Sequence, residues 1–246
     1  MYFPGEEPRD VLTRKIPKPQ APSALLDFVR QFRVYPGHIV EWGCGGGWNL
    51  VPFRNAGWSV VGYDFDSRYV ELGRDILGLD LREIQLMKQQ SELSPIPDVV
   101  LLNHVLEHAV DPRALLEELR DFSSMSTLIV VGIPLLETIR FWHWKPFFHI
   151  AHIHYFSMRT LKYVANLAEL EVVHESREQG LFVLKRTRKP SASVGSPGRS
   201  SAMFSAVYLA AGFLDVRYRL RALARYVLKS LGLLSTARQA RAWLRQ

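Results

Sequence analysis

The sequence predicts an α/β fold in which helices cover both faces of a mostly parallel β-sheet. Two observations support this fold class. Short apolar segments alternate along the chain with segments of helical periodicity, which is the order that βαβ units produce. Among the apolar segments, 98–103 is nearly continuous in Val and Leu, as a strand buried on both faces should be.

Length and composition set bounds on the protein. Its 246 residues, 48% hydrophobic and 22% charged, fit one folded domain with an appendage. The single cysteine, Cys44, excludes an internal disulfide bond and a zinc site made of cysteines. We find neither the apolar core of a secretory signal nor a run of about 20 apolar residues, so we expect a cytoplasmic protein.

The individual elements follow from local patterns. The first 22 residues hold five prolines, which is typical of an extended arm, and Ser23 could then cap a short amphipathic helix. The predicted strands are 38–42, 58–63, 83–87, 98–103, 127–132 and a closing hairpin of 171–177 with 181–185. The predicted helices run from a glycine loop to about residue 56, over 67–77, from the cap Asp111 onward, and from the cap Ser157 through 168.

The pattern divides the chain into four predicted parts. An N-terminal arm and helix (1–36) precede the α/β domain (37–186), which an aromatic- and histidine-rich cap insertion (135–156) interrupts. A linker (187–200) then leads to a basic, amphipathic helical tail (201–246). We therefore look for chemistry in the domain and for a partner surface in the tail.

A glycine loop is the most informative segment. In HIVEWGCGGGWNL, residues 38–50, a strand runs into the loop and a helix follows, so that backbone N–H groups can approach a ligand closely. About twenty residues later the second strand ends in Asp64, which is placed to accept hydrogen bonds from a ribose diol. A nucleoside-containing cofactor is indicated. The dinucleotide pattern G-x-G-x-x-G fails, because its last position is Trp48.

Three ordered motifs resemble those of a known superfamily. The E-x-G-C-G-x-G run at 41–47 resembles the first motif of class I S-adenosylmethionine-dependent methyltransferases. DVVLLNHVLEHAVDP, residues 98–112, and HIHYFSMRTL, residues 152–161, are similar to the fourth-strand and late His-x-x-Phe-Ser motifs of its small-molecule branch. The resemblance covers about residues 36–186. It implies a seven-stranded Rossmann-like sheet and S-adenosyl-L-methionine as the cofactor.

The resemblance also implies roles for single residues. Asp64 would hold the ribose hydroxyls, Phe65 would lie against the adenine, and Asn103 would face the methionine moiety. The family often has an acid after the third strand for the adenine; this sequence has KQQSEL there, so Gln90 or Gln89 is expected to replace it. The methionine and ribose end of the cofactor would lie against the glycine-loop residues Glu41, Gly43, Cys44, Gly45 and Gly47.

Histidines are the candidate catalytic residues, because transfer to a hydroxyl needs a positioned acceptor and a base of near-neutral pKa. His104 and His108 follow the fourth strand at i, i+4 spacing, so either could border the cofactor and acceptor. The alternative is that Glu107 and His108 form a structural turn between strand and helix. His154 is interpreted as a cap residue that faces the acceptor, with simple packing as its alternative.

No metal site is expected from the sequence. His149, His152 and His154 form an H-x-x-H-x-H run that is not a zinc-binding signature, and the nearest carboxylate in the sequence is Glu137.

The net charge of +7 is concentrated in the tail. Residues 185–246 hold 13 Lys and Arg and one Asp, a net of +12, whereas residues 1–184 hold 18 basic and 23 acidic residues, a net of −5. Four cations recur every four residues beside an apolar stripe: Arg217, Arg221, Arg225 and Lys229. This pattern favours an interfacial helix on an anionic membrane. A partner-binding or dimerising helix, or one folded back on the acidic body, are the alternatives.

We therefore predict a methyltransferase that O-methylates a small or lipid-linked acceptor, with saccharides among the candidates, at the inner face of the membrane. Asn103 is followed by HVL rather than by the Pro-Pro-aromatic motif of enzymes that methylate nucleic-acid bases. Two alternatives stay open: an RNA methyltransferase that uses the tail as a phosphate clamp, and a non-catalytic membrane-associated scaffold of the same fold. Nucleic acid is disfavoured as a partner, since the body is acidic.

Overall fold

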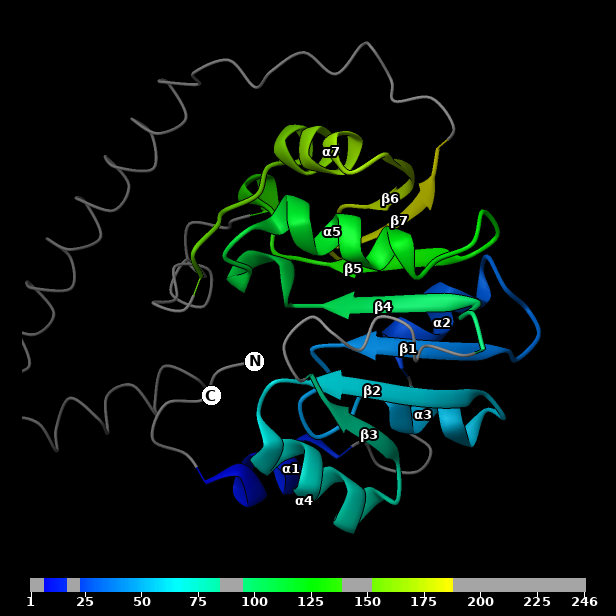
Figure 1. Cartoon of the computed structure of the whole chain (residues 1–246), viewed down its shortest axis with the longest axis vertical. Helices are drawn as coiled ribbons and strands as arrows, with labels where there is room; N and C mark the ends of the chain where they lie inside the picture. Colours follow the sequence, from blue (N-terminus) through cyan, green and yellow to red (C-terminus); the bar gives the residue numbers. More distant parts are fainter. Residues whose placement is uncertain (1–6, 17–22, 85–94, 139–151, 188–246) are drawn as a thin grey trace, which may run out of the picture. The chain divides into compact units, whose positions relative to one another are not determined.

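The computed structural model describes residues 7–16, 23–84, 95–138 and 152–187 (Figure 1). In these ranges seven strands form one sheet in the order β3-β2-β1-β4-β5-β7-β6. The first five are parallel, and β7 runs antiparallel to both of its neighbours, β5 and β6. The strands are β1 His38–Trp42, β2 Ser59–Asp64, β3 Asp80–Glu83, β4 Val99–Asn103, β5 Leu128–Gly132, β6 Leu170–Ser176 and β7 Leu181–Arg186. The predicted mostly parallel, seven-stranded sheet is confirmed.

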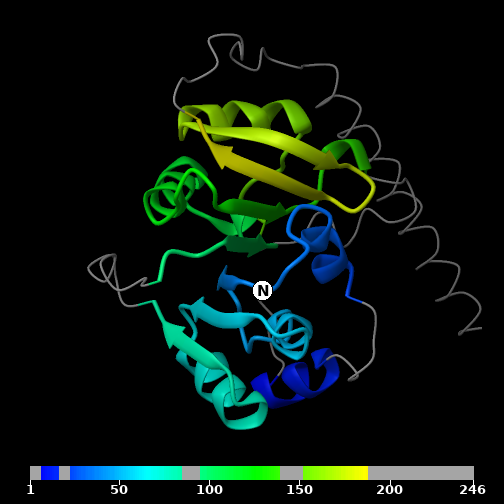
Figure 2. The same ribbon diagram turned by 90° about the vertical axis from the view of Figure 1, so that its right-hand side faces the viewer.

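Helices cover both faces of this sheet, as predicted. The helices are α1 Pro8–Lys15, α2 Ala24–Arg30, α3 Leu50–Asn55, α4 Ser67–Leu77, α5 Pro112–Asp121 and α7 Met158–Leu167, with short 3-10 turns η2 Leu106–His108 and η3 Leu136–Thr138. Figure 2 shows α2 and α3 on one side of the sheet and α5 on the other. Each side has its own apolar cluster, and successive residues of β4, such as Val99 and Val100, contribute to opposite clusters.

Capping residues fix where the helices begin. Asp111 accepts a hydrogen bond from the backbone N–H of Ala114, and Pro112 occupies the first helical position of α5. Ser157 and Thr160 form a reciprocal capping box at the start of α7. The helix starts predicted at Asp111 and Ser157 agree with these caps.

Two local predictions were wrong. The third strand was expected at 83–87, but β3 is Asp80–Glu83, which pairs with β2 so that Leu81 lies beside Gly62. Because β3 is an edge strand, it needs only one buried apolar residue, and its mostly polar sequence does not show the apolar run by which strands are recognised. The arm also contains a helix, α1, which starts at Pro8, buries Val11 and lies beside α4.

Several predicted parts lie partly or wholly outside the described residues. The cap insertion is described only at 135–138 and 152–156, and the linker and the tail 201–246 are not described beyond residue 187. Within the described ranges, no helix has both the length and the apolar character needed to cross a membrane.

Candidate functional site

The site is built where the direction of the chain through the sheet reverses. From β1 the sheet continues through β2 to β3 on one side, and from β4 through β5 on the other. The loops that follow β1 and β4 therefore meet at the carboxyl ends of two adjacent strands, which is where ligands bind in open α/β sheets. The glycine loop follows β1 and the histidine motif follows β4.

The glycine loop depends on its glycines for both shape and space. Gly43, Gly45 and Gly47 have positive φ values of 73°, 53° and 80°. A Cβ atom on Gly43 would lie 2.4 Å from Cγ2 of Val105, so the loop after β4 closely approaches the loop after β1. The backbone N–H groups of Gly43 and Cys44 donate to the carbonyl of Tyr63 at 2.7 and 3.0 Å, which attaches the loop to β2.

Glu41 is a buried carboxyl with an unused oxygen. Its Oε1 accepts a hydrogen bond from Asn49 Nδ2 at 2.7 Å, while Oε2 is buried without a partner among the described residues. Burial, with a contribution from the nearby charge of Asp64, raises the pKa of Glu41 to about 8 against the lowering effect of the Asn49 hydrogen bond. An unpaired buried oxygen beside a glycine loop fits a ligand that brings a hydrogen-bond donor or a positive charge.

Asp64 lies at the rim of the same loop. Its Oδ2 accepts from the N–H of Gly45 at 2.7 Å and its Oδ1 accepts from the N–H of Asp66 at 2.9 Å. Each carboxylate oxygen keeps a second lone pair, so ribose hydroxyls can still bind there. The next residue, Phe65, is 66% exposed and so is accessible to an aromatic ligand. These two roles stay predictions.

Cys44 contributes packing and backbone groups. Its side chain is buried in the apolar cluster beneath the loop, and a Cβ on Gly62 would lie 2.7 Å from its Sγ. Burial raises the pKa of the Cys44 thiol, and the nearby carboxyls Glu41 and Asp64 raise it further. The thiol is therefore not an activated nucleophile.

Sequence reasoning missed Gly73, which brings α4 against the glycine loop. A Cβ atom at this helical position would lie 2.4 Å from the backbone oxygen of Gly46. Only glycine lets the helix and the loop come this close. The signal in the sequence was a glycine in the middle of the helical pattern 67–77. Glycine there destabilises a helix by about 1 kcal/mol relative to alanine, which indicates a packing or functional requirement.

The end of β4 carries Asn103 and His104. The Asn103 side chain lies over Gly132 of β5, where a Cβ would come within 2.2 Å of its Oδ1. His104 has a φ of 56°, in the left-handed region, and its N–H donates to the carbonyl of Gly132 at 2.8 Å. The backbone reversal turns the His104 ring toward Glu107, with Nδ1 3.1 Å from Oε1.

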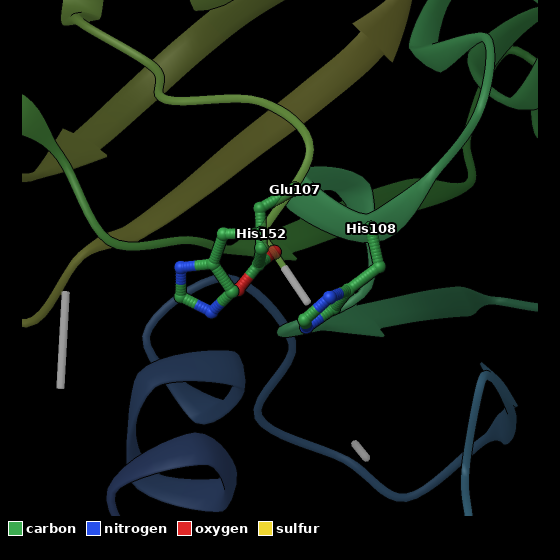
Figure 3. Close-up of side chains that lie close together, drawn as sticks. All are labelled: Glu107, His108 and His152. Atoms are coloured by element: carbon green, nitrogen blue, oxygen red, sulfur yellow. The ribbon is translucent and has the colours of Figure 1, made fainter. Parts of the chain in front are cut away.

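The structure brings the two predicted histidine motifs together (Figure 3). The N–H groups of Ile153 and His154 donate to the carbonyl of Glu107 at 2.9 and 3.0 Å. This places the His152 ring 4.9 Å from the His108 ring, measured between centroids, with a Glu107 carboxylate oxygen near a nitrogen of each ring. Residues Leu106–His108 form the turn η2 between strand and helix, as the structural alternative predicts. A role of His108 beside the cofactor and acceptor stays a prediction.

Four predicted site residues remain: His104, His108, His154 and Gln90. His104 and His108 do not share the face of one helix, because His104 precedes η2 in the left-handed conformation. The His154 ring faces Phe156, with centroids 6.1 Å apart, and its Nε2 is buried with no hydrogen-bond partner in the described ranges. Gln90 lies outside the described residues.

Comparison with known proteins identifies the family. A model of a methyltransferase domain matches residues 14–175, well over half of the chain. The chain belongs to this methyltransferase family. The search of curated proteins finds no match.

Solved structures share the fold of the methyltransferase at low sequence identity. The amino pentose methyltransferase of Micromonospora echinaspora, solved with S-adenosylmethionine, is 16% identical at a TM-score of 0.54, over 76% of this chain and 98% of that one. A sugar N-methyltransferase of a Streptoalloteichus species is 13% identical at 0.55, over 76% and 96%. Magnesium protoporphyrin IX methyltransferase of Synechocystis, with S-adenosylhomocysteine, is 15% identical at 0.50, over 73% and 94%.

The protein is thus an enzyme, a class I S-adenosylmethionine-dependent methyltransferase, and the predicted cofactor is confirmed. The residues of the site fit this cofactor. The positive-φ glycines leave room beside the backbone, and Glu41 has a buried, unpartnered oxygen next to them. A non-catalytic scaffold is accordingly set aside.

Proposed function

We propose that this methyltransferase methylates an oxygen atom of a small acceptor, and that the acceptor is lipid-linked, with a saccharide as the favoured class. The observation that carries the oxygen assignment is the His104–Glu107 pair at the end of β4, next to the glycine loop. A hydroxyl acceptor has a proton to lose, and this pair offers a histidine held by a carboxylate to receive it.

The chain's own residues divide the work as follows. Glu41, the glycine loop, Asp64, Phe65 and Asn103 would hold the cofactor, which supplies an electrophilic methyl group when bound. The buried Glu107 carboxylate accepts the Nδ1–H of His104 and so fixes the tautomer and direction of that ring. With the ring proton on Nδ1, Nε2 of His104 carries no proton and would take the hydroxyl proton of the acceptor. His108 and His154 would border the acceptor.

The acceptor class rests on two further observations. Two of the structural neighbours, at TM-scores of 0.54 and 0.55, are an amino pentose methyltransferase and a sugar N-methyltransferase. The tail carries the positive charge of the chain, which suits an enzyme that meets its acceptor at an anionic membrane surface in the cytoplasm. Both observations support the proposal without deciding between individual acceptors.

The first experiment separates cofactor binding from acceptor class. Calorimetry with S-adenosylmethionine is expected to show binding by the wild type and much weaker binding by Asp64→Ala. The full-length enzyme is then incubated with methyl-labelled cofactor and with separated aqueous, lipid and RNA extracts. Label in a lipid-extractable saccharide supports the proposal. Label in RNA alone, with binding that falls steeply with salt, would favour the RNA methyltransferase instead.

The second experiment tests the membrane. Full-length protein is expected to float with vesicles that contain anionic lipid and not with neutral vesicles, because arginines and lysine on one stripe contribute about 1 kcal/mol each near an anionic surface. Replacement of Arg217, Arg221 and Arg225 by Glu should abolish flotation and leave cofactor binding unchanged. Equal flotation of both proteins would remove the membrane from the proposal.

A further inference from the structure

The cluster of Glu107, His108 and His152 is assembled from two distant segments. Figure 3 shows the Glu107 carboxylate and the two imidazole rings close together. One carboxylate oxygen and one nitrogen of each ring lie within 4.8 Å of one another. Backbone hydrogen bonds from the N–H groups of Ile153 and His154 to the Glu107 carbonyl hold the two segments together. The arrangement is therefore fixed by the backbone rather than by a chance meeting of surface side chains.

One oxygen of the Glu107 carboxylate has no hydrogen-bond partner among the described residues. Its side chain is 1% exposed, and Oε1 is engaged by His104 Nδ1 at 3.1 Å. The second oxygen, Oε2, is buried and has no hydrogen-bond partner in the part of the chain that the structure describes. An unpaired buried oxygen of this kind lowers stability, so native structures rarely keep one without a purpose. A cation between Oε2 and the two imidazoles would remove this cost.

We propose that Glu107, His108 and His152 bind one divalent transition-metal ion of the Zn²⁺ class, through Glu107 Oε2 and one nitrogen of each imidazole. Two imidazoles and a carboxylate form a ligand set that suits Zn²⁺ and leaves a position open for water or substrate, whereas Mg²⁺ and Ca²⁺ prefer oxygen ligands. Ligands about 2.0–2.2 Å from a shared ion lie roughly 3–4 Å apart, so small side-chain rotations complete the site.

The surroundings suit a ligating carboxylate. His104 Nδ1 donates to Glu107 Oε1 and thereby orients the oxygen pair, as partners of metal-bound carboxylates do. The turn that carries the cluster also adjoins the glycine loop through the contact between Val105 and Gly43. An ion there would have an open position for the acceptor oxygen and would make its hydroxyl more acidic. This use of the ion rests on the proposed O-methylation, whereas binding of the ion does not.

Metal binding is measured directly on the full-length protein. The chain is freed of metal with a chelator and titrated with Co²⁺, whose visible absorption reports coordination by nitrogen ligands, and Zn²⁺ is then used to displace it. The wild type is expected to bind one ion per chain. Glu107→Gln, which keeps the shape but not the charge, and His152→Ala should each bind roughly tenfold or more weakly.

His38→Ala is the matched control for loss of a histidine. His38 lies at the amino end of β1, where its ring is bonded to Ser59, on the opposite edge of the sheet from the cluster. This variant should bind the ion as the wild type does. Calorimetry with S-adenosylmethionine on every variant shows that each is folded, and it tests the proposed function separately from the metal site.

The outcomes are distinct. Loss of Co²⁺ and Zn²⁺ binding in Glu107→Gln and His152→Ala, with cofactor binding kept, supports the site. No ion in the wild type, equal binding by His152→Ala, or preference for Mg²⁺ over Zn²⁺ overturns it. Failure of the wild type to bind S-adenosylmethionine would instead overturn the proposed function, whatever the metal result.

Discussion

Glu41 is the residue whose protonation should respond most to the cofactor. Burial raises its pKa to about 8, so the carboxyl is mostly protonated at neutral pH. A positive group beside its unpartnered Oε2 would favour the ionised form. We predict that S-adenosylmethionine binding at neutral pH releases a proton, detected by calorimetry in buffers of different ionisation enthalpy. Glu41→Gln should release none, and the same proton count for both proteins would contradict this role.

His104 is the residue at which chemistry and backbone geometry can be separated. Its φ of 56° is uncommon for residues other than glycine, but asparagine tolerates it. His104→Asn should therefore fold and bind cofactor normally, while methyl transfer to the active extract falls about 10²–10⁴-fold for lack of the base. Rates with cofactor in excess measure this, and His38→Asn is the control. An unchanged rate would exclude His104 as the base.

At the scale of the element, the contact between α4 and the glycine loop sets the position of the loop. Alanine in place of a helical glycine normally stabilises a helix by about 1 kcal/mol. At Gly73 the new Cβ would meet the backbone oxygen of Gly46, so we predict that Gly73→Ala destabilises the fold by about 1–3 kcal/mol and weakens cofactor binding. Denaturant titration and calorimetry measure these effects.

Gly78 supplies the matched control for that prediction. It ends α4 at a φ of 60°, and a Cβ there would meet nothing within 4 Å. Gly78→Ala should therefore lower stability through backbone strain and leave cofactor affinity unchanged. If the two variants affected cofactor binding equally, the approach of α4 to the loop would not be what matters.

The elements also show which parts of the fold a sequence reveals. Strands buried on both faces, such as β4 and β5, were predicted within one residue of their bounds because their apolar runs are nearly continuous. The edge strand β3, with the sequence DLRE, carries one buried residue, Leu81, and has no such run. Its position is set by pairing with β2, which local sequence does not encode.

Only the part of the candidate site that local sequence patterns encode could be predicted. The glycine loop and Asp64 are local signals, and the family resemblance interprets them. The Glu107–His152 contact joins segments that are far apart in the sequence, through backbone hydrogen bonds that any residue types could form. Along the sequence the nearest carboxylate to this histidine run is Glu137, whereas in the structure Glu107 lies beside His152.

In the molecule as a whole, the order of the strands concentrates polar groups at one edge of the sheet. The switch between β1 and β4 places Glu41 and Glu107 near this edge, next to the two apolar clusters. Each has a buried carboxylate oxygen without a hydrogen-bond partner among the described residues. Buried polar groups without partners lower the free energy of unfolding of the domain, and at this edge the same groups are available to bind a ligand. Ligands should therefore return stability to the whole domain.

The pH dependence of global stability is the last expected consequence. Below the ordinary pKa of 4.5, Glu41 is protonated in both the folded and the unfolded chain; between about 4.5 and 8 only the unfolded chain loses the proton. The free energy of unfolding should therefore fall as pH rises through this window, by about 3–5 kcal/mol from Glu41, and level off above pH 8. Glu41→Gln keeps an oxygen for Asn49 and should remove this slope. Denaturant titrations across the window measure it, and parallel curves for the two proteins would show that Glu41 is ionised in the folded domain.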